Sequence, residues 1–185
     1  MNLSEKQKSG LLVVSGLGLG LLALSDVTEP KTDKPKTATR PLRPASKTAR
    51  VAGEQFIRSL LKYVKVPPIP WCMGGTGDSC FDCSGFGYMA ANDLGVEIPR
   101  TASGQSKASA PTHEWQAARI PGALVIFERK KDKAIRHVEY SLGNGLNTVA
   151  SQVKGGVKIY KWGWWNYPKQ KKLWNIYYGL LPNFT

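Results

Sequence analysis

The stretch Phe81-Asp82-Cys83-Ser84-Gly85-Phe86 decides how the first half of the chain folds. Asp82 is a good N-cap, because its side-chain oxygen can accept the free backbone N–H groups of a first helical turn. An apolar repeat with helical spacing follows and stops at Gly95; its members are Phe86, Ala90 and Leu94. The pattern predicts a helix that begins at Cys83.

A cysteine at the head of a helix can act as a nucleophile. The unpaired N–H groups and the positive end of the helix dipole favour the thiolate over the thiol, and the thiolate is the reactive form. The alternative is that Cys83 is a small buried core residue, as most free cysteines are. This stretch alone leaves both interpretations open.

The length and charge of the chain limit its class. A chain of 185 residues can hold one domain with a sizeable core and a tail or anchor. The formal net charge of +13 indicates a polyanionic neighbour, which could be nucleic acid, an anionic membrane surface or acidic wall polymers. Charge alone does not choose among these partners, and it can also serve solubility only.

The cysteines lie close together in the sequence, at Cys72, Cys80 and Cys83. If Cys83 is reactive, Cys72 and Cys80 can form a disulfide that closes a glycine-rich loop, which fits an oxidising compartment. The competing hypothesis is a zinc site, since Cys80 and Cys83 have C-x2-C spacing. A second C-x2-C pair is missing, so we expect no metal and no cofactor.

The first fifty residues differ in composition from the rest. Lys6 and Lys8 precede an apolar run over residues 11–24, and this pattern is typical of a signal peptide or, if uncleaved, a membrane anchor over residues 1–25. Residues 26–49 are rich in proline, lysine and threonine and predict a disordered basic linker. The folded domain is then expected over residues 50–185.

Within this domain, helices come first and strands second. An apolar face over residues 51–64 predicts a helix that Pro67 and Pro68 end, and a short polar helix is expected around Gln105. Alternating apolar segments and glycine turns predict strands over 123–127, 135–142, 146–151, 157–162 and 174–180. This order is typical of an α+β fold with an antiparallel sheet.

Five motifs follow one another in the domain: Pro70-Trp71-Cys72-Met73-Gly74-Gly75; Asp82-Cys83-Ser84-Gly85; Ile98-Pro99-Arg100-Thr101 with Gln105; Pro121-Gly122-Ala123-Leu124-Val125-Ile126-Phe127; and His137-Val138 with Leu142-Gly143-Asn144-Gly145. In this order they resemble the motifs of the NlpC-type cell-wall endopeptidases, a family of papain-like cysteine peptidases. The resemblance implies a papain-like α+β domain with its nucleophile at a helix N-terminus, packed on an antiparallel sheet.

The resemblance also implies roles for particular residues. Cys83 is the expected nucleophile and His137 the expected general base and acid, which fits a thiolate that needs an imidazole titrating near neutrality. The implied substrate is the peptide stem of peptidoglycan. Asp82 and Ser84 are expected to hold the free amine of the stem, and Trp71 stands where the family has a tyrosine of the substrate site.

One position departs from the family in a way that affects catalysis. The residue that usually orients the base is polar, and counting from the Gly-Asn-Gly turn places Val149 there. Valine cannot hydrogen-bond an imidazole. Asn147 and Ser151 share the strand face of Val149 by the two-residue period, so we expect one of them to substitute.

The sequence is therefore consistent with three functions. The first is an exported or membrane-tethered cysteine endopeptidase that cuts peptidoglycan stems, in wall remodelling or in phage lysis or entry. The second is a weakened or inactive wall-binding or virion module with the same fold. The third is a basic nucleic-acid binder that uses the aromatic residues and lysines of 160–178, although packing of the sheet explains these aromatics better.

Overall fold

The computed structural model describes residues 47–77 and 79–184, with side chains from residue 53 onward, and these residues belong to one compact unit. The expected signal peptide or anchor and residues 26–46 of the expected linker lie outside the described residues. No helix in the described part of the chain is both long and apolar enough to span a membrane.

The first helix, α1 (Lys47–Leu61), takes up the last three residues assigned to the linker and ends before Val64. Phe56, Ile57 and Leu60 are buried as its apolar face predicts. Leu61, expected on the same face, is 37% exposed. This helix packs against α2 and against the C-terminal turn η2 (Pro182–Phe184), where Phe184 stacks on Phe56.

The second helix, α2 (Cys83–Asn92), begins at the predicted residue. The chain leaves it through a turn in which Gly95 has a φ of +68°, as expected for a C-terminal glycine. A small hairpin, β1 (Thr76–Gly77) with β2 (Cys80–Phe81), leads directly into this helix. The polar helix expected around Gln105 is α3 (Ala102–Ala108).

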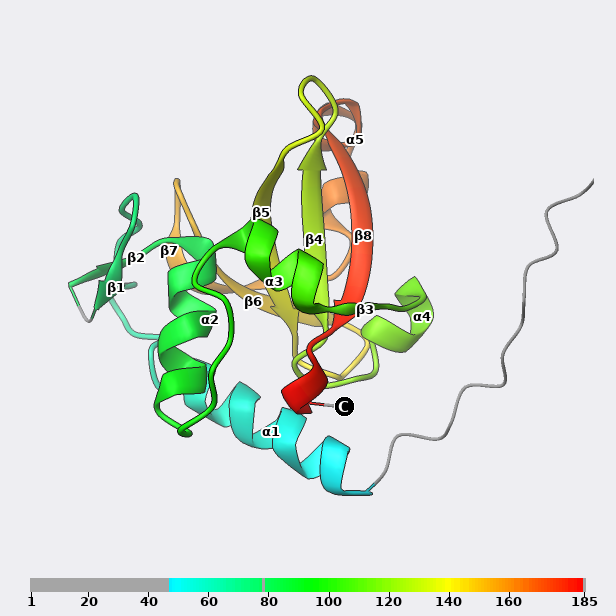
Figure 1. Ribbon diagram of the computed structural model, residues 1–185. Helices are drawn as coiled ribbons and strands as arrows, with labels where there is room; N and C mark the ends of the chain where they lie inside the picture. The colour runs from blue at the N-terminus through cyan, green and yellow to red at the C-terminus, as the bar shows by residue number, and fades with distance from the viewer. Residues whose placement is uncertain (1–46, 78, 185) are drawn as a thin grey trace, which may run out of the picture. The chain divides into compact units, whose positions relative to one another are not determined.

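The main sheet has six strands in the order β3-β8-β4-β5-β6-β7, all antiparallel (Figure 1). Their bounds are β3 (Ala110–Pro111), β4 (Leu124–Arg129), β5 (Ile135–Ser141), β6 (Asn147–Gln152), β7 (Gly156–Lys161) and β8 (Trp174–Leu180). The five predicted strands are confirmed. The sheet and the helices together confirm the α+β class.

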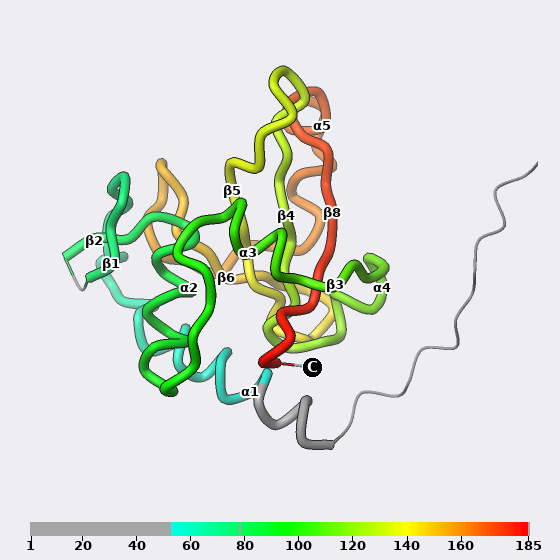
Figure 2. The backbone as a smooth tube through the Cα atoms, in the orientation of Figure 1, coloured from blue at the N-terminus to red at the C-terminus, as the bar shows by residue number. Residues whose placement is uncertain are grey.

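The two faces of the sheet have separate cores. Alternation along β4 sends Leu124 and Ile126 into the core that faces α1, α2 and α3, and Val125 and Phe127 into the core on the other face. Figure 2 shows the backbone of β4 running between β5 and β8. The second face is covered by aromatic side chains from the segment between β7 and β8, which contains η1 (Trp164–Asn166) and α5 (Pro168–Leu173). The interpretation that these aromatics pack the sheet is confirmed for Trp165, which is buried.

Candidate active site

Cys83 is fixed at the head of α2 by the predicted cap. The Asp82 carboxylate accepts a hydrogen bond from the backbone N–H of Gly85 at 2.6 Å. The same carboxylate accepts the N–H of Gly74 at 3.0 Å, which ties the preceding loop to the helix. The cap therefore sets both the start of the helix and the position of the sulfur.

The sulfur lies against the backbone of β5. Its Sγ is 4.0 Å from the carbonyl oxygen of Arg136, and the N–H of Val138 donates to it. Strands β5 and β6 pair at Tyr140 with Val149 and at Ser141 with Thr148, whereas the start of β5 pairs with β4. The edge of β5 that faces β6 is therefore left for the helix head at its start. His137, between Arg136 and Val138, hydrogen-bonds to Cys83. The structure thus brings together the two expected catalytic side chains.

The pair stabilises its own charged form. Burial raises the pKa of the Cys83 thiol, but the charge and hydrogen bond of His137 outweigh burial and leave this pKa below its usual value. Burial lowers the pKa of His137, but the Cys83 thiolate and the Glu139 carboxylate outweigh burial and raise it. The favoured state is a thiolate beside an imidazolium.

Access to this pair is narrow. Cys83 is 8% exposed and the side chain of His137 is 16% exposed. The imidazole packs edge to face on Phe127, with ring centroids 5.0 Å apart. Both side chains of the pair therefore expose only a small part of their surface.

The far nitrogen of His137 faces Glu139, a residue to which sequence reasoning gave no role. His137 Nε2 lies 3.3 Å from Glu139 Oε1, which leaves Nδ1 as the nitrogen for Cys83. The two residues are two positions apart on β5 and therefore share one face of the sheet. This spacing, with a carboxylate inside an apolar strand, is the signal that could have found Glu139.

The expectation that Asn147 or Ser151 orients the base is wrong. Val149 is buried among the core residues that face the helices, and Ser151 donates its hydroxyl hydrogen to the carbonyl oxygen of Phe81 at 2.8 Å. Asn147, at the start of β6, is two residues before Val149 and lies on the same face of the strand. The face of β6 that meets His137 and Glu139 carries Thr148 and Gln152 instead. Asn147, Val149 and Ser151 therefore share one face of β6, as expected, but this face is opposite to the one that meets His137 and Glu139.

The expected substrate residues Asp82 and Ser84 form one cluster with Arg100. Arg100 Nη2 pairs with Asp82 Oδ2 at 2.8 Å, and Arg100 Nη1 donates to Ser84 Oγ at 3.3 Å. Partial burial raises the pKa of Asp82, but the hydrogen bonds from Arg100 and Gly85 hold it below its usual value. Asp82 is therefore an ionised carboxylate with a cation already bound.

A buried polar network holds the back of α2. Gln105 Nε2 donates to the carbonyl oxygens of Ser84 at 3.1 Å and Pro99 at 2.9 Å, and Gln105 Oε1 accepts the Tyr140 hydroxyl at 2.8 Å. The hydroxyl of Tyr140 reaches α2 at Gly87, where a Cβ atom would collide with it. This network joins α2, α3 and β5 around the head of the helix.

The loop before the nucleophile is closed by a disulfide between Cys72 and Cys80. The zinc hypothesis is therefore wrong, because two of its three thiols are bonded to each other. Trp71 is half-buried, and its neighbours Pro70 and Cys72 hydrogen-bond to the backbone of Phe81. Trp71 thus lies in the segment next to Asp82, as the motif implies.

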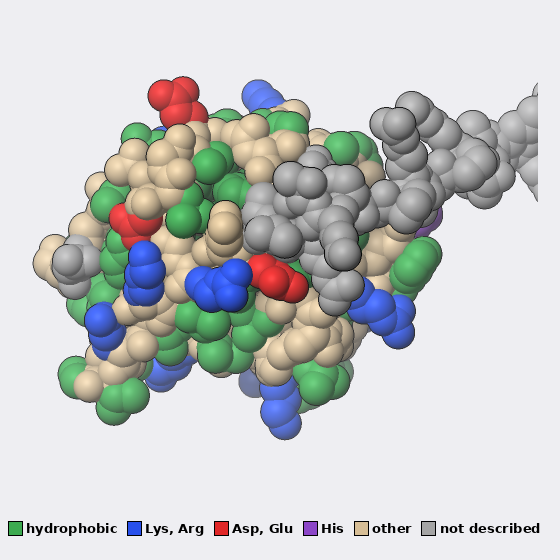
Figure 3. Space-filling view, turned by 90° about the horizontal axis from the view of Figure 1, so that it is seen from below, with side chains coloured by type: hydrophobic (Ala, Val, Ile, Leu, Met, Phe, Trp, Pro, Cys, Tyr) green, Lys and Arg blue, Asp and Glu red, His purple; other side chains and the backbone are tan. Residues whose placement is uncertain are grey.

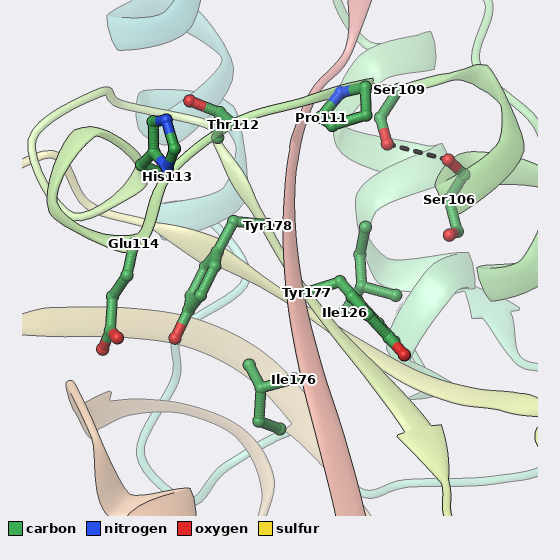
Figure 4. Close-up of a pocket in the computed structure, with 10 residues that line it drawn as sticks. All are labelled: Ser106, Ser109, Pro111, Thr112, His113, Glu114, Ile126, Ile176, Tyr177 and Tyr178. Carbon is green, nitrogen blue, oxygen red and sulfur yellow. Dashed lines mark hydrogen bonds between the residues drawn. The ribbon is translucent and has the colours of Figure 1, made fainter. Parts of the chain in front are cut away.

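The second histidine is remote from this site. His113 is exposed at the start of α4 (Glu114–Ala117) and lines a cavity of about 440 Å³ between α3, α4 and β8 (Figure 4). Glu114 and Tyr178 point into the same space, where burial first and Glu114 second raise the pKa of Tyr178. Neither Cys83 nor His137 lines this cavity.

The fold and the site together define a class, an α+β domain with a papain-like cysteine–histidine pair. A family model described as NlpC/P60 family matches residues 69–172, and the chain belongs to that family.

Relatives with known names agree with this assignment. The probable endopeptidase p60 of Listeria welshimeri is 37% identical over 97 residues, which cover 51% of this chain and 17% of that protein. The gamma-D-glutamyl-L-lysine dipeptidyl-peptidase of Bacillus subtilis is 38% identical over 80 residues, which cover 42% of this chain and 26% of that protein. The match thus spans about a quarter or less of these relatives.

Solved structures share the fold. An NlpC/P60 family protein from Bacillus cereus superimposes with a TM-score of 0.58 at 24% identity, over 71% of this chain and 41% of that one. At this identity the likeness concerns the fold alone.

Proposed function

We propose that this protein is a cysteine endopeptidase that hydrolyses amide bonds in the peptide stems of bacterial peptidoglycan. The observation that carries the proposal is the contact of Cys83, at a capped helix head, with His137. Family membership supports the substrate class, because the B. subtilis relative is named for a γ-D-glutamyl-L-lysine bond. Such a substrate implies that the protein acts outside the cytoplasm, secreted, periplasmic or tethered to a membrane.

The chemistry follows from the two side chains. The Cys83 thiolate attacks the amide carbonyl, and the backbone N–H of Cys83 at the helix start helps to stabilise the oxyanion. The imidazolium of His137 gives its proton to the leaving amine as the C–N bond breaks. Neutral His137 then takes a proton from water, whose oxygen attacks the thioester and releases the acid and the thiolate.

The Asp82, Ser84 and Arg100 cluster is the proposed site for the free amine of the stem. The amine is a cation, and the second lone pairs of the Asp82 carboxylate and the Ser84 hydroxyl can accept its hydrogens. Arg100 keeps Asp82 ionised and in place. An acetylated stem lacks this charge, so we expect the enzyme to prefer stems with a free amino terminus.

The test is cleavage of purified muropeptides by the full chain, followed by mass spectrometry. Cys83→Ala should abolish cleavage, with a loss of at least about 10³-fold, because the variant lacks the thiolate that attacks the amide carbonyl. The matched control is the double variant Cys72→Ser with Cys80→Ser, which removes the two disulfide-bonded cysteines but leaves the nucleophile. A wild-type protein that binds walls and leaves every stem intact would instead support the wall-binding or virion module.

A further inference from the structure

We propose that Glu139 is the positioning residue for His137, in the role that the family resemblance assigns to position 149. The inference rests on the proposed function for its catalytic meaning and on geometry for its contacts. Glu139 is fully buried and lies on the same strand as His137, whereas position 149 lies on the neighbouring strand. The orienting group has thus moved from β6 to β5.

The surroundings of Glu139 select a carboxylate. Thr148 Oγ1 donates to Oε2 at 2.6 Å and Gln152 Nε2 donates to Oε1 at 2.7 Å. Trp164 Nε1 donates to both oxygens, at 3.0 and 3.2 Å. These groups act here as donors, and a carboxylate is the side chain that only accepts. Burial of a charge is costly unless its hydrogen bonds are satisfied, and here they are.

The donors other than His137 carry no charge. They hold Glu139 in place through β6 and η1 whether or not His137 is protonated. Trp164 is itself fixed by stacking on Phe127, with ring centroids 5.6 Å apart. Phe127 also packs against His137. The imidazole is therefore held by an anchored carboxylate on one nitrogen and an aromatic ring on its side.

The charge of Glu139 gives it a function beyond shape. An imidazolium between a thiolate and a carboxylate is more stable than one beside a neutral amide. The other titratable groups near this cluster are Asp82 with its partner Arg100 at the head of α2, Tyr140 on β5 and Tyr160 on β7. Burial and then the charge of Cys83 raise the pKa of Tyr140, so Tyr140 stays neutral. Burial and then the charge of Glu139 raise the pKa of Tyr160 to about 12, so Tyr160 stays neutral. Glu139 is the anion that acts on His137 from the strand side.

The decisive variant is Glu139→Gln, which keeps the shape and an acceptor oxygen but removes the charge. The measurement is the rate of Cys83 alkylation by iodoacetamide against pH in the full chain, without substrate. We expect the apparent pKa of the thiol to rise by about one unit and the rate near pH 6 to fall about tenfold. Glu139→Asp restores the charge and should move the profile back toward wild type.

Matched controls keep the result interpretable. Glu114→Gln also removes a carboxylate that accepts an indole N–H, from Trp162 at 3.2 Å, but it lies away from Cys83 and should leave the profile unchanged. Should Glu139→Gln fail to fold, Gln152→Ala removes one donor to Glu139 and should produce a smaller shift in the same direction. If Glu139→Gln folds and its alkylation profile matches that of the wild type, the inference is overturned. If Glu139→Gln does not fold, a wild-type profile in folded Gln152→Ala overturns it. A shifted profile in a protein that cleaves no stem peptide leaves the inference standing and overturns the proposed function.

Discussion

At the scale of single residues, the Cys83–His137 pair sets the pH range of activity. Because the pKa of Cys83 is lowered, kcat/KM should rise with pH at values below the usual thiol pKa of about 8.5. Because the pKa of His137 is raised, the proton needed by the leaving amine is lost only above the usual imidazole pKa of about 6.5. We expect kcat/KM to form a plateau through neutral pH. A maximum of kcat/KM confined to pH above 9 would contradict the ion pair. The two pKa values of this profile describe the coupled Cys83–His137 pair and not either residue alone.

Arg100 should matter for stability as well as for substrate. In Arg100→Gln the mostly buried Asp82 carboxylate loses its cation, and we expect the free energy of unfolding to fall by about 1–3 kcal/mol. The folded pKa of Asp82 is lowered, so its contribution is present above the unfolded value of about 3.9 and is lost as pH falls through the folded pKa. Urea unfolding at pH 7 and pH 3 measures both effects.

The control for this prediction is Arg136→Gln. Its ion pair with Asp132 joins two partly exposed side chains that solvent screens, so we expect a smaller loss than for Arg100→Gln. Equal losses for the two arginines at pH 7 would contradict a special role for Arg100.

Local patterns predicted the nucleophile better than they predicted the orienting residue. Cys83 follows from its own neighbours in sequence, because a cap and an apolar repeat are local features. Glu139 depends on which face of β5 meets which face of β6, and that is a tertiary fact. Counting from the turn found Val149, whose side chain faces the helices.

At the scale of elements, α2 can approach its neighbours because two of its residues lack side chains. A Cβ atom on Gly85 would collide with the carbonyl oxygen of Gly75, a backbone atom that cannot rotate away. We therefore expect Gly85→Ala to displace the helix head, cost about 1–3 kcal/mol of stability and reduce cleavage. Gly77→Ala is the control, since nothing lies within 4 Å of its Cβ position. Thermal unfolding and muropeptide cleavage should separate the two, and a harmless Gly85→Ala contradicts the close packing.

The strand segments follow from the sequence, but their order does not. Turns at 129–133 and 143–145 join neighbours, so β4, β5 and β6 pair in succession as hairpins. The last strand, β8, returns to pair with β4 and with β3, far away in the sequence. That pairing places aromatics between β7 and β8 over Phe127, which helps to fix His137. No local sequence pattern predicts this pairing of β8 with β4 and β3.

At the scale of the whole molecule, the excess positive charge bears on what the protein adheres to. On the face shown in Figure 3, lysine and arginine side chains are spread among hydrophobic and acidic ones. The lysine-bearing helix α5 adds three exposed cations, Lys169, Lys171 and Lys172. Dispersed charge of this kind attracts a polyanion over a long range. This attraction weakens with distance and with rising salt concentration.

Attachment to anionic walls should therefore depend on salt. We expect Cys83→Ala protein to bind wall fragments that carry acidic polymers, and to lose at least about tenfold in affinity between about 0.1 M and 1 M salt, where the screening length falls from about 10 Å to about 3 Å. Changing the three α5 lysines to glutamine lowers the net charge from +13 to +10 and should weaken binding at low salt. Fragments stripped of acidic polymers serve as the control. A binding curve that is flat in salt assigns adhesion to stem-peptide recognition instead, while tighter and equally salt-dependent binding to single-stranded DNA than to walls favours the nucleic-acid hypothesis.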